Sequence, residues 1–227
     1  MIRFLASVRD RTEALDALAA GADIIDFKDP AQGALGALAP EEIGRGIAAV
    51  AGRALTSATA GDWPLEPDPL VAAARRIGST GVDYVKLGLL PGAALLSCIH
   101  GLRSAAREHR LVAVFFADRG VPFEALEPLR AAGFAGAMLD TAKKTGGGLR
   151  RHLDDSALTH FVDRAREVGL MTGLAGSLRR DDIPSLACAR PDLLGFRGAL
   201  CDEGRSSALS CERTREIRHA IDAASVR

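Results

Sequence analysis

Lysines are the residues of this sequence with the clearest capacity for covalent chemistry. They make up only four of the 29 basic residues, Lys28, Lys86, Lys143 and Lys144, and arginine supplies the rest. Arginine keeps its charge in proteins, whereas lysine can lose a proton and then attack a carbonyl or act as a base. Because arginine serves almost everywhere else, the remaining lysines are the first candidates for amine chemistry.

Lys28 lies at the end of a short apolar stretch, residues 23–30, whose composition predicts a buried strand. β-Branched and aromatic residues lead into the charged positions, and a proline ends the segment. Side chains alternate along a strand, so Asp26 and Lys28 share one face, while Ile25 and Phe27 share the other. Burying a carboxylate beside an amine is costly, which indicates a functional role for the pair.

Two later segments, residues 81–86 and more loosely residues 133–138, resemble residues 21–26 and extend this pattern. Counted from the glycine that begins each segment, Asp26 and Lys86 lie five positions further on, and Lys28 and Asp140 lie seven positions further on. Odd offsets place all these side chains on the same face of their strands. The charged residues predicted to share that face are Asp26, Lys28, Lys86 and Asp140.

The chain as a whole alternates apolar strand patterns with helical patterns. We expect strands at residues 2–7, in the stretch described above, and at 54–58, 82–87, 111–116, 136–139, 170–174 and 193–196, with helices at 11–20, 41–50, 70–77, 92–109, 123–132, 156–168, 182–187 and 207–223. Such alternation is typical of parallel strands joined by helices. Eight units in 227 residues predict an α/β protein with one domain, a (β/α)8 barrel over residues 1–227, and a doubly wound sheet is the main alternative.

In a barrel, the functional site lies at the carboxyl ends of the strands, where several polar residues of this sequence fall. Glycine-rich segments follow the seventh and eighth expected strands, and such loops often bind phosphate through backbone N–H groups. We therefore predict that the residues Gly176, Ser177, Arg197 and Gly198 bind a phosphate. Ser57, at the exit of the third strand, is predicted to position the substrate.

Several amines and carboxylates without a metal-ligand pattern indicate carbonyl chemistry through a Schiff base. In this hypothesis one desolvated lysine attacks a carbonyl, and a second lysine and a carboxylate move protons. Crowded ammonium groups and burial should lower the pKa of at least one lysine. The pattern alone does not choose between Lys143 and Lys144 as the third lysine.

Composition argues against several other classes of function. The formal net charge is zero and no basic run is longer than two arginines, so we expect no nucleic-acid partner and no membrane partner. The four cysteines lack the spacing of a zinc site, and we expect neither a metal nor another cofactor. We expect a cytoplasmic protein that acts on a phosphorylated aldehyde and forms a homo-oligomer.

Together, these motifs resemble the (5-formylfuran-3-yl)methyl phosphate synthase family of methanofuran biosynthesis, also called 4-(hydroxymethyl)-2-furancarboxaldehyde-phosphate synthase. The segments that carry the resemblance run in order through almost the whole chain: 21–30 (GADIIDFKDP), 33–36, 57–62, 83–88 (DYVKLG), 137–142 (AMLDTA), 174–177 (LAGS) and 195–201 (GFRGALC). The resemblance implies a (β/α)8 barrel that makes a furan aldehyde phosphate from two molecules of glyceraldehyde 3-phosphate without a cofactor.

The resemblance also implies roles for individual residues. It places the Schiff-base lysine at Lys28 and the supporting lysine at Lys86. It places the two aspartates at Asp26 and Asp140, and the third lysine at Lys144. The residues alone leave two alternative functions open. One is a class I sugar-phosphate aldolase, which would use the same lysines, and the other is a sensor of phosphorylated metabolites, which would not need an amine at Lys28.

Overall fold

A computed structural model describes residues 1–144 and 147–225 of the chain. Its strands are β1 (Arg3–Val8), β2 (Ile24–Phe27), β3 (Leu55–Thr59), β4 (Tyr84–Gly88), β5 (Leu111–Phe116), β6 (Gly136–Asp140), β7 (Met171–Leu174) and β8 (Leu193–Phe196). Its α-helices are α1 (Arg11–Ala19), α2 (Pro40–Val50), α3 (Pro67–Gly78), α4 (Leu95–Gly101), α5 (Arg103–Glu108), α6 (Leu126–Ala132), α7 (Asp155–Glu167), α8 (Ile183–Cys188) and α9 (Cys211–Ser225).

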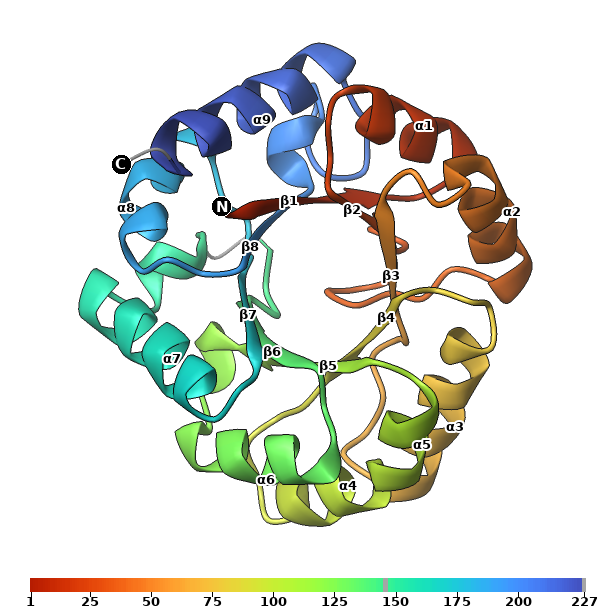
Figure 1. Ribbon diagram of the computed structural model, residues 1–227, viewed down its shortest axis with the longest axis vertical. Coiled ribbons are helices and arrows are strands. Elements are labelled where there is room, and N and C mark those ends of the chain that lie inside the picture. The colour runs from red at the N-terminus through yellow and green to blue at the C-terminus, as the bar shows by residue number, and fades with distance from the viewer. Residues whose placement is uncertain (145–146, 226–227) are drawn as a thin grey trace.

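The strands form a closed parallel barrel in sequence order, from β1 to β8 and back to β1. The helices surround this ring on the outside (Figure 1). Each connection carries at least one helix, as parallel neighbours require. The predicted (β/α)8 barrel is therefore confirmed.

The alternation of side chains divides the apolar residues into two cores. Ile25 and Phe27 point outward and pack in the larger core between the strands and the helices. Ile24 points inward and belongs to a smaller core inside the barrel, together with Leu35 from the loop after β2. The opposite faces predicted for these strand residues are thus confirmed, and Asp26 of β2 and Lys28 directly after it lie on the inner side of the barrel.

Helix boundaries differ from the sequence-based prediction at several places. The helix predicted over residues 92–109 is split into α4 and α5, and Gly101, at the break, packs so closely that an added Cβ would lie 2.9 Å from Pro67. Glycine is also a weak helix former, which favours a break at this position. Helix α3 begins at Pro67, three residues earlier than predicted, because proline is tolerated in the first turn of a helix.

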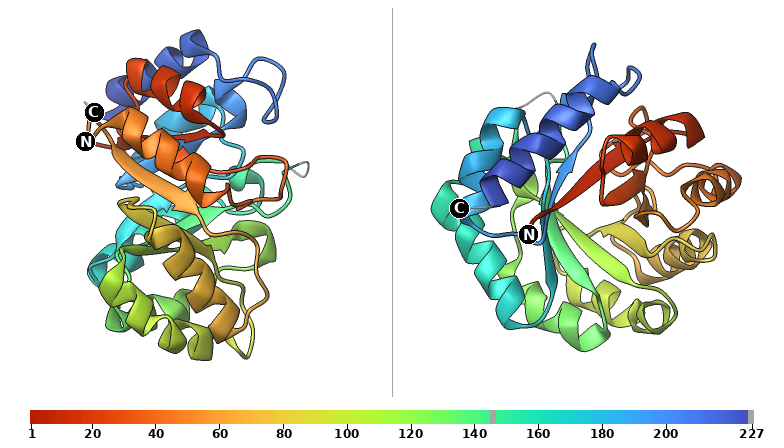
Figure 2. Two further views of the ribbon diagram at one scale, coloured as in Figure 1. Left: turned by 90° about the vertical axis from the view of Figure 1, so that its right-hand side faces the viewer. Right: turned by 45° about the horizontal axis from the view of Figure 1, so that its top comes forward.

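The last helix also begins later than predicted, at Cys211. The preceding residues form a loop closed by an isolated antiparallel bridge between Cys201 and Leu209. In the left view of Figure 2 this loop projects at the same end of the barrel as the loop between β2 and α2, and the N-terminus lies at the other end. This loop after β8 therefore borders the functional end of the barrel.

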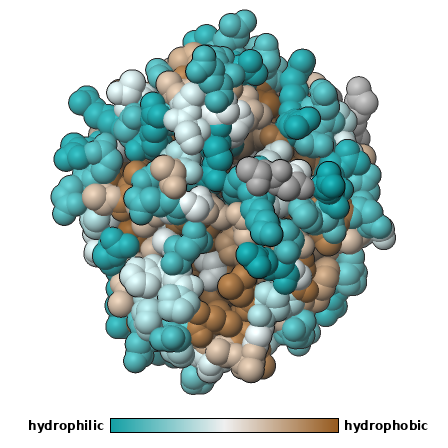
Figure 3. Space-filling view, turned by 180° about the vertical axis from the view of Figure 1, so that it is seen from behind, coloured by the Kyte–Doolittle hydropathy of each residue, from teal (hydrophilic) through white to brown (hydrophobic). Residues whose placement is uncertain are grey.

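Figure 3 looks onto the end of the barrel that carries these loops. Hydrophilic side chains cover much of this face, and a hydrophobic area lies in the lower half of the view. The exposed large hydrophobic residues include Trp63 and Leu90, which follow β3 and β4, and Leu96 of α4. No helix in the described part of the chain is long and apolar enough to cross a membrane.

Two glycines of α2 provide a matched test of the packing between helix and barrel. An added Cβ at Gly46 would lie 2.2 Å from the ring of the fully buried Phe27, whereas an added Cβ at Gly44 would meet nothing within 4 Å. We expect Gly46→Ala to lower the free energy of unfolding, because overpacking costs about 1–3 kcal/mol and outweighs the gain in helix propensity. Gly44→Ala should raise it by about 0.5–1 kcal/mol, since only the propensity changes.

Urea unfolding of both variants measures this difference. Equal stabilisation by the two substitutions would show that α2 does not pack against Phe27 in this way.

Candidate active site

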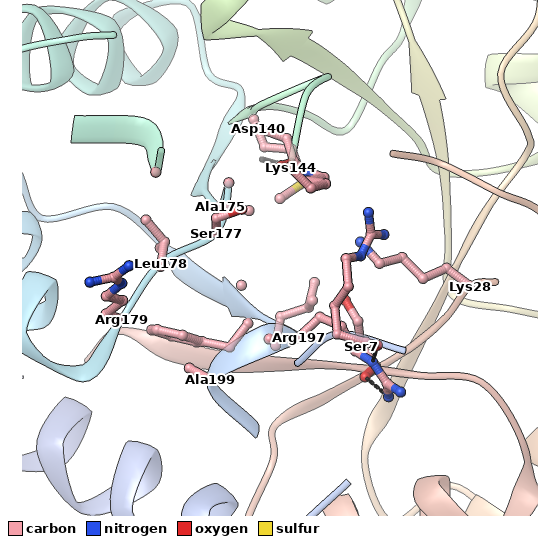
Figure 4. Close-up of a pocket in the computed structure, with 18 of the residues that line it drawn as sticks. Ser7, Lys28, Asp140, Lys144, Ala175, Ser177, Leu178, Arg179, Arg197 and Ala199 are labelled. Atoms are coloured by element: carbon pink, nitrogen blue, oxygen red, sulfur yellow. Dashed lines mark hydrogen bonds and ion pairs between the residues drawn. The ribbon is translucent and has the colours of Figure 1, made fainter. Parts of the chain in front are cut away.

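A cavity of about 530 Å³ lies at the carboxyl ends of the strands. Its polar lining comes from the strands and from the loops after β6, β7 and β8, and includes Ser7, Lys28, Lys86, Asp140, Lys144, Ser177, Arg179, Arg197 and Arg205. Figure 4 shows Lys28 reaching the cavity from one side and Arg179 lying on the other, with Asp140 and Lys144 together at a third position. The structure thus brings together the lysines predicted from strands β2, β4 and β6.

Asp26 lies beneath this cavity and is fully buried. One carboxylate oxygen accepts a hydrogen bond from Ser57 Oγ at 2.7 Å. The other accepts from Ser7 Oγ at 2.9 Å and lies 2.6 Å from Lys86 Nζ. Three neighbouring strands therefore compensate the charge of Asp26 and hold the amine of Lys86 at the floor of the cavity.

Asp140 and Lys144 form a second pair of carboxylate and amine. Lys144 Nζ lies 2.5 Å from Asp140 Oδ1, and that oxygen also accepts the backbone N–H of Thr141. The ammonium groups of Lys144 and Lys28 hold the pKa of Asp140 below its ordinary value, although burial alone would raise it. Lys143 is exposed, so the structure selects Lys144 as the lysine that lines the site.

The loop that carries Lys144 is held by Asp118, which follows β5. Its two carboxylate oxygens accept the backbone N–H groups of Ala142 and Lys143, at 2.7 and 2.9 Å. Burial alone would raise the pKa of Asp118, but these backbone hydrogen bonds lower it below its usual range. Asp118 thereby fixes the direction in which the chain leaves β6.

Lys28 differs from the other two lysines in its partners. Its amine donates only a long hydrogen bond, 3.5 Å, to the carbonyl of Ala34, and no carboxylate of the described residues lies within 4 Å of it. Burial lowers the pKa of Lys28 from 10.5 to about 8. The carboxylate of Asp140 opposes this shift, and the ammonium groups of Lys86 and Lys144 add to it. Near physiological pH a larger fraction of Lys28 is therefore neutral than of an ordinary lysine, although the protonated form still predominates.

Arg197 is buried, and protein acceptors engage its guanidinium group. It forms an ion pair with the buried Glu13 through both terminal nitrogens. Its remaining hydrogen bonds go to the backbone carbonyls of Ser7, Arg205 and Ser207. These five hydrogen bonds match the five N–H groups of a guanidinium. The geometry gives Arg197 a supporting role, and no N–H of its side chain remains for the phosphate contact predicted from the sequence.

The glycine-rich loops after β7 and β8 lie in the cavity wall, where the sequence places them. Gly176 has a φ of +107°, and an added Cβ there would lie 3.0 Å from the backbone nitrogen of Thr141. Only glycine fits such a position without strain. Ser177 and Gly198 also line the cavity. The binding of a phosphate by these loops stays a prediction. Ser57, which was predicted to position the substrate, is not among the residues that line the cavity; its hydroxyl donates to Asp26 beneath the cavity.

Three polar residues that line the cavity, Ser7, Arg179 and Arg205, were not predicted as site residues. Ser7 is signalled by the alternation of β1, whose apolar residues Phe4 and Val8 face outward. Arg179 and Arg205 lie in loops, where no periodicity indicates the direction of a side chain. Only their spatial neighbours place them in the wall of the cavity.

The arrangement has the parts needed for amine catalysis on an anionic carbonyl compound. Lys28 supplies a buried amine that is partly neutral, and two pairs of lysine and aspartate can give and accept protons beside it. Cationic side chains outnumber carboxylates in the lining, which favours negatively charged ligands. Within the described residues, no group of three His, Cys, Asp or Glu side chains is placed to hold a metal ion.

Comparisons with known proteins agree with the motifs. A family model described as 4-HFC-P synthase matches residues 4–218. A putative (5-formylfuran-3-yl)methyl phosphate synthase of Methylorubrum extorquens is 45% identical over 226 residues, which cover 99% of this chain and 88% of that protein. The (5-formylfuran-3-yl)methyl phosphate synthase of Methanopyrus kandleri is 35% identical over 234 residues, which cover 96% of this chain and 98% of that protein.

Solved structures support the fold. Phosphoribosyl anthranilate isomerase from Thermotoga maritima superposes with a TM-score of 0.72 at 17% identity, and the match covers 98% of this chain and 100% of that one. At this identity the likeness shows the barrel alone.

The pKa of Lys28 predicts how the reactivity of this amine depends on pH. Labelling of Lys28 by trinitrobenzenesulfonate should have its midpoint near pH 8, because only the neutral amine reacts. Lys86→Met removes an ammonium that lowers this pKa, so the midpoint should move to higher pH. Asp140→Asn removes a carboxylate that raises it, so the midpoint should move to lower pH. Peptide mass mapping measures the labelling, and unmoved midpoints in both variants would show that the groups do not share a cavity.

The buried ion pair predicts that Arg197 supports stability. Arg197→Met should lower the free energy of unfolding by about 3–5 kcal/mol, because it leaves the carboxylate of Glu13 buried without a partner. Arg213→Met provides the control, since its ion pair with Asp202 is exposed and should contribute less than about 1 kcal/mol. Denaturant unfolding compares the two, and equal losses would contradict the supporting role of Arg197.

Proposed function

The chain belongs to the 4-HFC-P synthase family, and we propose that it condenses two molecules of glyceraldehyde 3-phosphate into (5-formylfuran-3-yl)methyl phosphate. The reaction would proceed through a Schiff base and release phosphate and water. The observation that carries this proposal is the amine of Lys28, which is buried, has a pKa near 8 and lies between two pairs of lysine and aspartate. The product would serve the synthesis of a methanofuran-type cofactor.

In the first step, the neutral amine of Lys28 attacks the aldehyde carbon of one triose phosphate, and loss of water gives an imine. The protonated imine withdraws electrons from the neighbouring carbon and makes its proton acidic. Lys28 suits this step because burial keeps part of it neutral, so the amine need not first give up a proton to solvent.

In the next step, a base removes the acidic proton and the phosphate ester at the adjoining carbon breaks. The electron pair of the broken C–H bond forms a carbon–carbon double bond, and the C–O pair leaves with phosphate. The pairs Lys86–Asp26 and Lys144–Asp140 are the candidates for proton transfer, because both lie in or directly beneath the cavity.

The second triose phosphate would then join the bound three-carbon unit by an aldol-type addition. Ring closure and loss of water complete the furan, and hydrolysis of the imine frees Lys28. The second triose phosphate keeps its phosphate group. The glycine-rich loops that contain Gly176, Ser177 and Gly198 are the candidates to bind this phosphate.

Incubation with glyceraldehyde 3-phosphate alone tests the proposal. A product with the mass of the furan aldehyde phosphate and the ultraviolet absorbance of a conjugated furan would support it. A six-carbon sugar bisphosphate without that absorbance would favour the class I aldolase instead. Ligand binding with neither product nor trapped imine would favour a sensor.

The assignment of the imine to Lys28 gives a further prediction. Lys28→Arg keeps a positive charge but cannot form an imine, so borohydride trapping with glyceraldehyde 3-phosphate and formation of the furan should both fall to background. Lys143→Arg is the matched control, because Lys143 is exposed and should change neither result. Mass spectrometry of the reduced protein locates the modified lysine, and full trapping in Lys28→Arg would move the nucleophile to another amine.

A further inference from the structure

Two arginines that line the cavity have no carboxylate partner within the described part of the chain. Lys86 pairs with Asp26, Lys144 with Asp140, and Arg197 with Glu13. Arg179 and Arg205 also line the cavity, and neither has a carboxylate oxygen within 4 Å among residues 1–144 and 147–225. A cation in such a cavity favours an anionic ligand group.

Arg205 lies beside the amine of Lys28. Its terminal nitrogen Nη2 donates to the carbonyl of Gly33 at 3.1 Å, and Lys28 Nζ donates to the carbonyl of Ala34 at 3.5 Å. The acceptors belong to consecutive residues of the loop after β2, so the two cations share one side of the cavity. Burial lowers the pKa of Arg205, and the carboxylates of Asp140, Asp29 and Asp62 oppose this shift. Among the described residues none of these carboxylates forms an ion pair with Arg205 within 4 Å, so its guanidinium can still pair with a ligand.

Hydrogen bonds to the backbone of the loop after β8 hold Arg205 in this position. Arg197 donates to the backbone carbonyls of Arg205 and Ser207, at 2.8 Å each. Glu13 accepts the backbone N–H of Leu209, and Leu209 pairs with Cys201 across the loop. The buried ion pair of Arg197 therefore serves to present Arg205 to the cavity.

Arg179 lies on a different side of the cavity. It follows β7 in the loop that holds Ser177, and Figure 4 shows it across the cavity from Lys28. Its backbone N–H donates to Asp182, which anchors the main chain at this point, and its side chain is exposed at the rim. The two arginines thus lie in different loops, one next to the reactive amine and one beside the glycine-rich segment.

We propose that Arg205 and Arg179 mark two separate phosphate subsites, one for each triose phosphate. Arg205 binds the phosphate of the molecule held on Lys28, which is the phosphate that leaves. Arg179, with the loop of Ser177, binds the phosphate that the product keeps. This inference rests on the proposed function, in which two phosphorylated molecules occupy the cavity together.

The subsite at Arg205 has a defined role in the elimination step. When the C–O bond breaks, negative charge grows on the leaving phosphate, and a guanidinium beside it can stabilise that charge with paired hydrogen bonds. The proton goes from the carbon to the base, and no oxidant or other reactant is needed. Arg205 therefore acts on the departing group, whereas Lys28 acts on the carbonyl.

Trapping of Lys28 by cyanoborohydride tests this assignment, with glyceraldehyde 3-phosphate and unphosphorylated glyceraldehyde as the two probes. Arg205→Ala should raise the half-saturating concentration of glyceraldehyde 3-phosphate by about tenfold or more, because it removes a charge-assisted contact. Trapping with glyceraldehyde should be unchanged. Arg205→Lys should recover part of the preference for the phosphorylated probe, and its thermal unfolding and that of Arg205→Ala should match the parent chain.

Arg179→Ala should show the complementary behaviour. Imine trapping with glyceraldehyde 3-phosphate should stay near that of the parent chain, while the concentration needed for half-maximal furan formation should rise. Arg180→Ala is the matched control, because this neighbouring arginine does not line the cavity and should change neither quantity.

The outcomes separate this inference from the proposed function. If the parent chain makes the furan but Arg205→Ala keeps the full preference for the phosphorylated probe, the subsite at Arg205 is wrong and the proposed function stands. If the preference is lost in Arg179→Ala instead, the phosphate of the imine lies in the loop of Ser177, and the assignment is overturned. If the parent chain forms neither an imine nor a furan, both proposals fall.

Discussion

The fully buried carboxylate of Asp26 is the constraint around which the functional end of the barrel is arranged. Removing a carboxylate from water costs several kcal/mol unless charge and hydrogen bonds compensate it. The compensation comes from Ser7 on β1, Ser57 on β3 and Lys86 on β4. One carboxylate therefore links four adjacent strands at the level where the cavity begins, and it holds the amine of Lys86 in place.

The lowered pKa of the Lys28 amine follows from the same constraint, because the carboxylates near it already pair with other lysines. Asp26 pairs with Lys86 and Asp140 pairs with Lys144, so Lys28 shares the cavity without a direct ion pair to any residue that the structure describes. Burial then disfavours its charged form more than the distant carboxylates favour it. A reactive amine thus arises from how partners are distributed among three lysines, and Arg197 after β8 and Glu13 of α1 likewise satisfy each other.

The sequence alone was sufficient to predict the barrel and the inward set of charged residues. Apolar strand patterns alternate with helical patterns along the chain, and eight such units in 227 residues favour a closed barrel over a doubly wound sheet. The period of two along a strand then requires Asp26 and Lys28 to share a face, and the equivalent offsets place Lys86 and Asp140 on it. These inferences needed only local periodicity, which is why the structure confirms the faces but moves the ends of helices such as α3 and α9.

Only the tertiary structure decided which cations are free to meet a ligand. Arg197 follows β8 next to a glycine, a position that predicts a phosphate ligand. Its guanidinium is instead paired with Glu13, 184 positions away in the chain, and with backbone carbonyls. Arg205 and Arg179 lie in loops without periodicity, and their exposure to the cavity depends on packing between distant segments. The sequence shows which residues carry charge, but whether a charge is already satisfied depends on neighbours that the fold brings together across long separations.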